Sequence, residues 1–492
     1  MTKSARGRKV LLLELNEITW DIADRLIAKG MMPNLGRMRS EGAWAVSEAV
    51  ERPPYLDPWI TWVTVHTGVD RSVHGAAVLE QDQATIKAKR TWEYAAEAGK
   101  SIGVFGSVGA YPPRPVGGFM VPGPFAPSNA TYPPYVEPVQ ALNRKYTQVH
   151  HKNAEQDSPR AMLQLGVDLL RLGLSPRTCL KIAAQLAREK ANPATHYKRV
   201  MLQPEINFDF FRVLYDRYRP DFATWHSNHA AHYMHHYWRA WDDSGFPSRA
   251  SEEEKSKYGK AVEEGYALVD DLLGRFQRLV DDDTVIAIAS SMGQKPYVNE
   301  LYPDGKVCVK FKDIHTVLGI VGAEGVSEVV PTMDPQWNVK VADGAHRARV
   351  RGALENVRCK GGVHDRAMHV EETGDILTVT PLGLAKLDPS VRYFFPDTPR
   401  AKAEGYLFDE LFRGYAETNK EGMHDPRGIF LLHGPGIARG LEIEGSTNLD
   451  IAPTLLALMG IAVPASIMGR PLGEAWGEAP SVRARRSAEV HA

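Results

Sequence analysis

The sequence of 492 residues predicts an α/β protein: a three-layer α/β/α core with a mostly parallel central sheet, and a small inserted α+β cap. Three observations predict this fold class. Several strand-like runs are apolar throughout, as parallel strands covered on both faces are. Helix-like segments alternate with these runs, which is typical of strand–helix–strand units. Residues 305–400 differ, because short alternating runs and glycine turns replace that pattern.

The first elements follow from local patterns. Residues 9–16, KVLLLELN, are a continuous apolar run that predicts a buried strand, and residues 18–30 have the apolar spacing of a helix. Residues 53–68 predict an extended entry followed by a helix. Asp57 would be the N-cap of that helix and Pro58 its first residue, because both types are favoured there.

The later strands and the last helix are predicted in the same way. Buried strands are expected at residues 101–107, 221–228, 282–293 and 428–437, and the last helix at residues 449–460. The carboxyl ends of parallel strands share one edge of the sheet, and functional sites gather there. Polar residues that directly follow these strands are therefore the first candidates for a site.

The chain is expected to divide into a discontinuous core, two insertions and a tail. Residues 1–304 and 401–476 form the core, and residues 136–215 form a helical insertion within it. Residues 305–400 form the cap. Residues 477–492 are polar and are expected to be disordered, because they offer too little apolar surface to fold.

Composition limits the classes of partner. The chain has 59 Lys and Arg against 60 Asp and Glu, so charge gives no reason to expect nucleic acid or an anionic membrane. Its three cysteines are far apart in the sequence, which indicates reduced thiols. No window of 18 apolar residues and no signal peptide is evident, so a cytoplasmic location is expected.

One short segment, WHSNHAAHYMHHYWRAW, holds five of the 17 histidines. It follows an expected strand and has helical spacing, and imidazole is a common metal ligand. The alternative is a packed surface of aromatic and histidine rings. On a helix, two adjacent faces would each carry three candidate ligands. One face carries Asn228, His232 and His235, and the other carries His229, His232 and His236.

Four segments, in order along the chain, resemble the alkaline phosphatase superfamily, and most of all its type I phosphodiesterase / nucleotide pyrophosphatase branch. They are LELNEITWD with MPNLGRMRSEGA; WVTVHTGVDRSVHG; NHAAH, which is similar to an Asp-x-x-x-His motif; and GMHDPRGIFLLHGPGI with LDIAPTLLALMGIAVPASIMGRPL. The resemblance implies an α/β fold. It also implies two divalent metal ions, usually zinc, bridged by a Thr or Ser nucleophile.

The chain departs from that pattern at one of the two metal sets. The first aspartate of the family falls on Asn16 and the nucleophile falls on Pro58, which has no hydroxyl. The Asp-His pair of that set, at the end of another strand, falls on Ser291 and Met292. In the other set, the aspartate of Asp-x-x-x-His falls on Asn228. These changes remove negative charge, so a single metal ion is expected.

The other metal set is kept in part. The resemblance retains His232 and His424, and we expect these two imidazoles to hold the ion. Asn228 and His229 are further candidate ligands. Either Asn16 or its neighbour Glu17 completes the set. Glu17 is the ligand if the end of the strand is shifted relative to the family pattern.

Four other residues are candidates for chemistry or substrate binding. Asp57 is either only an N-cap or a ligand or general base that replaces the missing hydroxyl. Thr61 lies one turn into the helix, near an end that favours anions, although packing is the simpler reading. Lys295 and His235 are candidate contacts for an anionic substrate. The alternative is that Lys295 is simply an exposed lysine and that His235 has a structural role.

These residues predict a metal-dependent hydrolase or transferase that acts on a phosphate ester of the phosphodiester or nucleotide pyrophosphate type. Zinc is the expected ion, with manganese or iron as alternatives, and no covalent intermediate is expected without a nucleophile at Pro58. The substrate would be a small anionic molecule, and a homodimer remains open. A non-catalytic protein that binds an anionic ligand is the alternative, as is a lyase or isomerase on the same scaffold.

Overall fold

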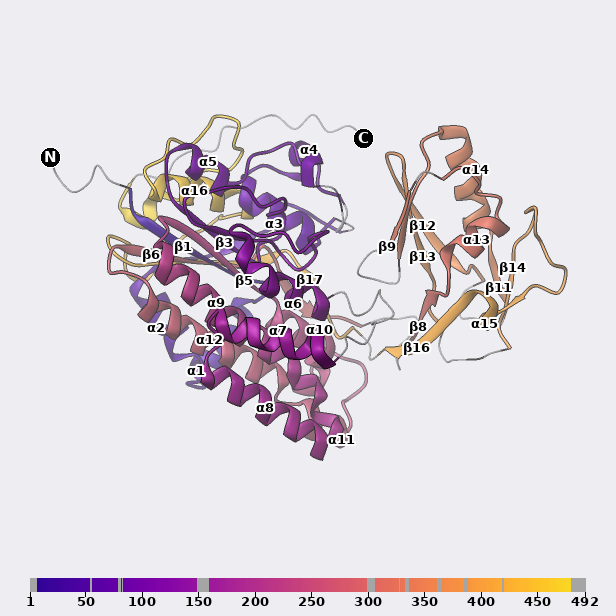
Figure 1. Ribbon diagram of the computed structural model, residues 1–492, viewed down its shortest axis with the longest axis horizontal. Helices are drawn as coiled ribbons and strands as arrows, with labels where there is room; N and C mark the ends of the chain where they lie inside the picture. Colours follow the sequence, from indigo (N-terminus) through magenta and orange to yellow (C-terminus); the bar gives the residue numbers. More distant parts are fainter. Residues whose placement is uncertain are drawn as a thin grey trace. The chain divides into compact units, whose positions relative to one another are not determined.

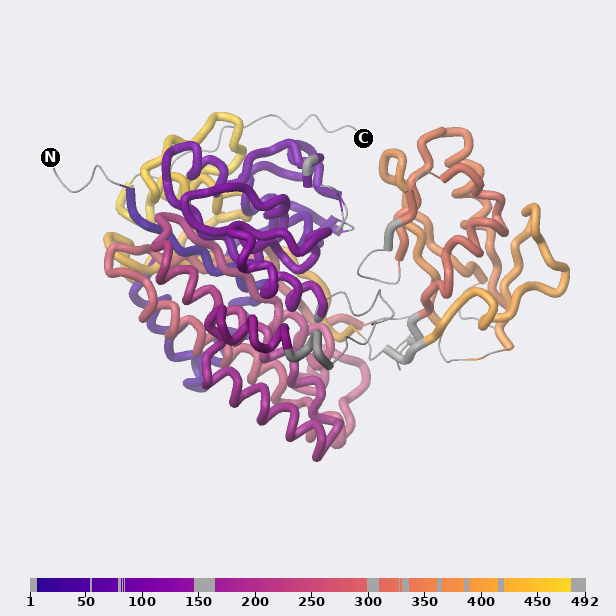
Figure 2. The backbone as a smooth tube through the Cα atoms, viewed as in Figure 1, coloured from indigo at the N-terminus to yellow at the C-terminus, as the bar shows by residue number. Residues whose placement is uncertain are grey.

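The computed structural model divides into two compact units (Figures 1 and 2). The first comprises Met1–Val149, Ala154–Tyr297 and Glu421–Ala492, and the second comprises His150–Asn153 and Val298–Lys420. The structure describes residues 7–53, 55–77, 81, 83–147, 159–298, 306–326, 328–331, 336–360, 365–384, 388, 390–417 and 420–478. Most of the expected tail, from residue 479 onward, lies outside these residues.

The first unit is built on an eight-stranded sheet with the order β19-β2-β18-β6-β1-β5-β3-β4. Strand β18 runs antiparallel to its neighbours β6 and β2, and the other pairings are parallel, which confirms the mostly parallel sheet. The strands are β1 (Lys9–Leu15), β2 (Ala43–Glu48), β3 (Ile102–Phe105), β4 (Phe119–Val121), β5 (Phe222–Ser227), β6 (Thr284–Ala289), β18 (Arg427–His433) and β19 (Leu441–Glu442).

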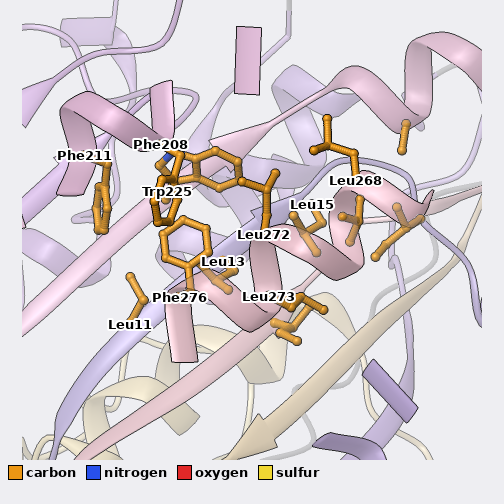
Figure 3. Packing of buried hydrophobic residues seen from close by; sticks show 14 of the residues in the cluster. Leu11, Leu13, Leu15, Phe208, Phe211, Trp225, Leu268, Leu272, Leu273 and Phe276 are labelled. Atoms are coloured by element: carbon orange, nitrogen blue, oxygen red, sulfur yellow. The ribbon is translucent and has the colours of Figure 1, made fainter. Parts of the chain in front are cut away.

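Helices cover both faces of this sheet because its central strands are apolar on both sides. In β1, Leu11, Leu13 and Leu15 belong to one core, and Val10 and Leu12 belong to the other. Figure 3 shows the first of these cores. Helices α1 (Trp20–Ala28), α2 (Pro33–Glu41), α9 (Leu202–Tyr218), α10 (His229–Trp241) and α12 (Ala261–Leu279) contribute to the first core, and α3 (Pro58–Thr67), α5 (Thr91–Glu97) and α16 (Ile451–Leu458) contribute to the second. The three-layer α/β/α fold is thereby confirmed.

The expected helical insertion, residues 136–215, is a succession of helices, and the last of them belongs to the sheet layers. Phe208, Phe211 and Leu214 of α9 are buried in the first core, so α9 is part of the central fold. The other helices of this region are α6 (Glu137–Thr147), α7 (Pro159–Arg171), α8 (Pro176–Ala191) and the 3-10 helix η4 (Pro193–Met201). The first unit also contains α4 (Arg71–His74) and α11 (Glu252–Tyr258).

The second unit has its own hydrophobic core, which includes Val317, Val339, Leu354 and Leu377. It is wider than residues 305–400, because its first and last strands, β8 and β16, pair with each other. Its strands are β8 (Lys306–Phe311), β9 (Glu328–Pro331), β10 (Trp337–Lys340), β11 (Arg358–Lys360), β12 (Met368–Thr373), β13 (Ile376–Pro381), β14 (Arg392–Phe394), β15 (Tyr406–Leu407) and β16 (Phe412–Glu417), and its helices are α13 (Ile314–Ile320), α14 (Gly344–Glu355) and α15 (Phe408–Leu411).

The carboxyl ends of β1 and β5 lie side by side, since Leu15 pairs with Ser227. Asn16 and Glu17 follow the first strand, and Asn228 with helix α10 follows the second. A short antiparallel pair, β7 (Gly293–Pro296) and β17 (Gly422–Asp425), follows β6 and precedes β18. Among the described helices, none has the length and apolar character needed to cross a bilayer.

Candidate metal centre

Three side chains from distant parts of the chain converge beyond the end of β1. They are Glu17, which follows that strand, His235 of α10 and His424 of β17, and one ligand atom of each lies within 4.8 Å of the others. The Nε2 atom of His235 is 3.0 Å from Glu17 Oε2, and the Nε2 atom of His424 is 3.7 Å from Glu17 Oε1. Two imidazoles and one carboxylate therefore share one small volume.

The other nitrogen of each imidazole contacts a backbone carbonyl. His235 Nδ1 is 2.8 Å from the oxygen of Gly422, and His424 Nδ1 is 2.7 Å from the oxygen of Leu56. A carbonyl oxygen can only accept, so each Nδ1 carries a proton and donates it. In the neutral rings this leaves the lone pairs of both Nε2 atoms facing the carboxylate. Histidines that bind a metal ion are oriented in this way.

The Glu17 side chain keeps its negative charge although it is buried. Burial alone would raise its pKa, but His235 and His424 in their protonated forms, with hydrogen bonds from His235 and Gln294, lower the pKa to about 2. An ionised carboxylate and two lone pairs cannot share a buried volume without protons or a cation between them. Two histidines and one carboxylate fit a single divalent ion, because they match the ligand types of zinc and iron sites.

Two amide side chains hold the Glu17 carboxylate. Gln294 Nε2 donates to Glu17 Oε2 and, at 3.1 Å, to the oxygen of Ala231. Asn16 Nδ2 donates to Glu17 Oε1 at 2.8 Å. Glu17 itself has a φ of +60°, a left-handed conformation that non-glycine residues rarely adopt. The turn after β1 thus directs the side chain of residue 17 toward the histidines.

The structure places the other expected ligands differently. Asn16 and Asn228 bond to each other, with Asn16 Nδ2 2.7 Å from Asn228 Oδ1. His229 is buried, and its Nδ1 and Nε2 contact Ser227 Oγ at 2.8 Å and the oxygen of Gly265 at 3.0 Å. Its burial lowers the pKa to about 4, so this ring is neutral and both its nitrogens are engaged within the protein.

His232 is not a member of the converging set, and its ring lies 4.5 Å from that of His236, centroid to centroid. The imidazole in the set is that of His235, which sequence reasoning assigned to the substrate. His235 lies almost one turn further along α10, where the oxygen of Gly422 fixes its ring. The helical face shared by Asn228, His232 and His235 was the signal that could have identified it.

Asp57 lies beside the set, while Lys295 points away from it. Asp57 Oδ1 is 3.3 Å from His424 Nδ1, and the side chain makes no capping hydrogen bond at the start of α3. Lys295 follows Gln294 in β7, so the two side chains project to opposite sides of the strand. The Lys295 side chain is 57% exposed, and its Nζ lies 3.9 Å from Asp425 Oδ2.

Thr61 is buried inside the fold. Its Oγ1 donates to Ser291 Oγ at 2.8 Å and lies 3.2 Å from the oxygen of Asp57. A hydroxyl with these contacts is fixed by the protein and has no exposed surface from which to attack a substrate. Its place in the helix therefore serves packing.

A family model described as type I phosphodiesterase / nucleotide pyrophosphatase matches residues 10–377. Similar solved structures include murine ectonucleotide pyrophosphatase / phosphodiesterase 5, at 12% identity over 93% of this chain and 96% of that chain, with a TM-score of 0.40. The alkaline phosphatase PafA is 13% identical over 96% of this chain and 99% of that chain, with a TM-score of 0.48. Comparison with curated proteins gave no significant match.

Proposed function

Because the chain belongs to the type I phosphodiesterase / nucleotide pyrophosphatase family, we propose that it hydrolyses a phosphate ester of the phosphodiester or nucleotide pyrophosphate type. We further propose that Glu17, His235 and His424 hold one divalent ion for this reaction. The supporting observation is that both Nε2 atoms face an ionised carboxylate while both Nδ1 atoms donate to backbone carbonyls.

A divalent ion at this position would neutralise negative charge that develops on the phosphoryl group. Zinc suits the ligand set best, and manganese or iron are the alternatives. Glu17 supplies the only negative charge of the set, and the carbonyls of Gly422 and Leu56 keep the two rings in position. The substrate is proposed to be a small molecule that carries the phosphate ester.

Water is proposed to attack phosphorus directly, and the P–O bond to the alcohol or phosphate leaving group breaks, with that group taking up a proton from solvent. Pro58 has no hydroxyl, and the buried hydroxyl of Thr61 is bonded to Ser291, so neither residue offers a nucleophile. Asp57 is partly exposed and lies beside His424, so its carboxylate is placed to accept the proton of the attacking water. This reaction forms no covalent bond between the enzyme and the phosphoryl group.

The metal content of the purified protein tests the proposal. Elemental mass spectrometry is expected to find one zinc, manganese or iron ion per chain. The variants His235→Ala and His424→Ala should lose the ion and the turnover of aryl phosphate diesters. His232→Ala is the matched control, since it removes an imidazole from the same helix but outside the set, and it should keep the ion. The ligand assignment is wrong if His232→Ala loses the ion and His235→Ala keeps it.

A non-catalytic protein that binds an anionic ligand is a second candidate. The neutral pair Asn16–Asn228 favours it, because these residues lack the carboxylates of the family pattern. In that case the protein would hold an ion and bind inorganic phosphate, but it would not turn over aryl phosphate monoesters or diesters with zinc, manganese or iron.

A further inference from the structure

The amide of Asn16 lies beside the proposed centre and is engaged through all of its hydrogen-bonding groups. Its Nδ2 donates to Glu17 Oε1 at 2.8 Å and to Asn228 Oδ1 at 2.7 Å. Its Oδ1 accepts from the indole Nε1 of Trp62 at 2.8 Å. An indole N–H can only donate, so the orientation of the amide is fixed. Both of its N–H groups and its oxygen are therefore satisfied in one geometry.

In the resemblance, one metal set of the family falls on Asn16, Pro58, Ser291 and Met292, and none of these four side chains carries a charge. Ser291 accepts a hydrogen bond from buried Thr61, and Met292 is buried in a small apolar cluster with Ala49 and Leu56. Asn228 contributes its amide oxygen, which already accepts from Asn16. In the resemblance, Asn228 belongs to the other metal set, the one that is kept in part with His232 and His424. Here the first four positions do not fit a second ion, because each offers a neutral group, and the Asn16 amide is already bonded to Asn228 and Trp62.

We infer that Asn16 is a positioning residue, which with Asn228 and Trp62 forms a neutral clamp in place of a second cation. The inference rests on the proposed function, since the clamp orients Glu17 for one ion. Through its two N–H groups Asn16 holds Glu17 Oε1 and locks itself to the end of β5. An N–H donor offsets the charge of the carboxylate without adding charge of its own, so one divalent ion completes the centre.

The clamp also explains how residue 17 keeps its uncommon backbone conformation. A left-handed φ at a glutamate persists only where the surroundings fix it. Here Gln294 holds one carboxylate oxygen and Asn16 holds the other. Removal of the Asn16 amide would release one of these oxygens, and the carboxylate would then be less well aligned with His235 and His424.

The affinity for zinc, measured by competition with a chelator, tests the positioning role. Asn16→Ala is expected to bind zinc about 10- to 100-fold more weakly than the wild type, the usual effect of losing a group that orients a ligand. Asn448→Ala is the matched control. Asn448 is also buried and also donates to a glutamate, Glu51, at 2.8 Å, but it lies outside the converging set. This control should keep the wild-type affinity even if it is less stable.

The number of bound ions tests whether the clamp replaces a cation. The double variant Asn16→Asp with Asn228→Asp puts two carboxylates where the amides now meet, and their repulsion should be relieved by an additional ion. Elemental mass spectrometry after zinc loading is expected to find one zinc per chain in the wild type and two in the double variant. An unchanged affinity in Asn16→Ala, or an unchanged zinc count in the double variant, would overturn the inference.

These outcomes separate the inference from the proposed function. A wild-type protein that binds neither zinc, manganese nor iron contradicts the proposed function. If the double variant alone binds zinc, the clamp is supported as a replacement for a cation although the native centre is not a metal site. If the wild type binds one zinc and Asn16→Ala binds it equally well, the metal centre stands and the clamp does not.

Discussion

The backbone at Glu17 shows how one residue decides the composition of the site. The left-handed conformation costs a glutamate about 1–2 kcal/mol relative to ordinary conformations. It turns residue 17, and not residue 16, toward His235 and His424. The side chain of Asn16 meets Asn228 and Trp62 instead. A shift of one residue at the end of β1 thus exchanges an amide for a carboxylate at the centre.

The buried His229 gives a prediction for the dependence of stability on pH. Burial lowers its pKa to about 4 in the folded state, while an unfolded chain has a histidine pKa of about 6.5. As the pH falls, the unfolded state binds the proton first, so the free energy of unfolding decreases. For this histidine alone the expected loss between pH 7 and pH 5 is about 2 kcal/mol.

Urea denaturation at the two pH values measures this loss. His229→Gln should reduce the difference in unfolding free energy between pH 7 and pH 5. His196→Gln is the control, because that side chain is 68% exposed. Equal pH dependence in the wild type and in His229→Gln would show that the ring does not stay neutral in the folded protein.

At the scale of elements, helix α12 packs against strand β5, whose end lies beside the site. Its Phe276 is fully buried, and the ring lies 4.9 Å from Phe208 and 5.0 Å from Trp225, centroid to centroid (Figure 3). Trp225 lies in β5, three residues before Asn228. The same packing therefore supports the strand whose end carries the Asn16–Asn228 pair.

Phe276→Ala is expected to lower the free energy of unfolding by about 3–5 kcal/mol, since it removes a large buried ring and leaves a cavity. Leu180→Ala in α8 is the comparison, because that side chain is 72% exposed, and its effect should stay within about 0.5 kcal/mol. Urea denaturation measures both variants. If the two variants lost similar amounts of unfolding free energy, the packing around Phe276 would not be an important source of stability.

At the scale of the whole molecule, the chain forms two units with separate hydrophobic cores. Leu13 is fully buried in the first, and Leu377 is fully buried in the second. Two units of a chain are expected to unfold in a single cooperative transition only if they share one hydrophobic core. Denaturation should therefore proceed in two steps, one for each unit.

Calorimetry with one variant in each core tests this prediction. Leu377→Ala should lower the temperature of one transition and Leu13→Ala that of the other, each by an amount that corresponds to about 2–5 kcal/mol. A single transition that both variants shift equally would show that the two units unfold as one.

The sequence by itself determined the fold class and the family. A continuous apolar run such as residues 9–16 indicates a strand buried on both faces, and this pattern can be recognised within one short segment of the sequence. For this reason β1 begins and ends close to the expected positions. The motifs at both ends of the chain indicated the family, and the match over residues 10–377 confirms it. The sequence also identified Glu17 as a candidate, because it follows a buried strand, and His424, because the resemblance to the family retains it.

Only the tertiary structure decided which side chains meet. His232 and His235 lie on the same helix and the motif selected the first, but the position of β17 against α10 brings His235 to His424. The hydrogen bond between Asn16 and Asn228 depends on the register between β1 and β5. Sequence spacing fixes the direction of a side chain on its own element. The distance between side chains on three elements depends on how those elements pack, which contacts far apart in the sequence determine.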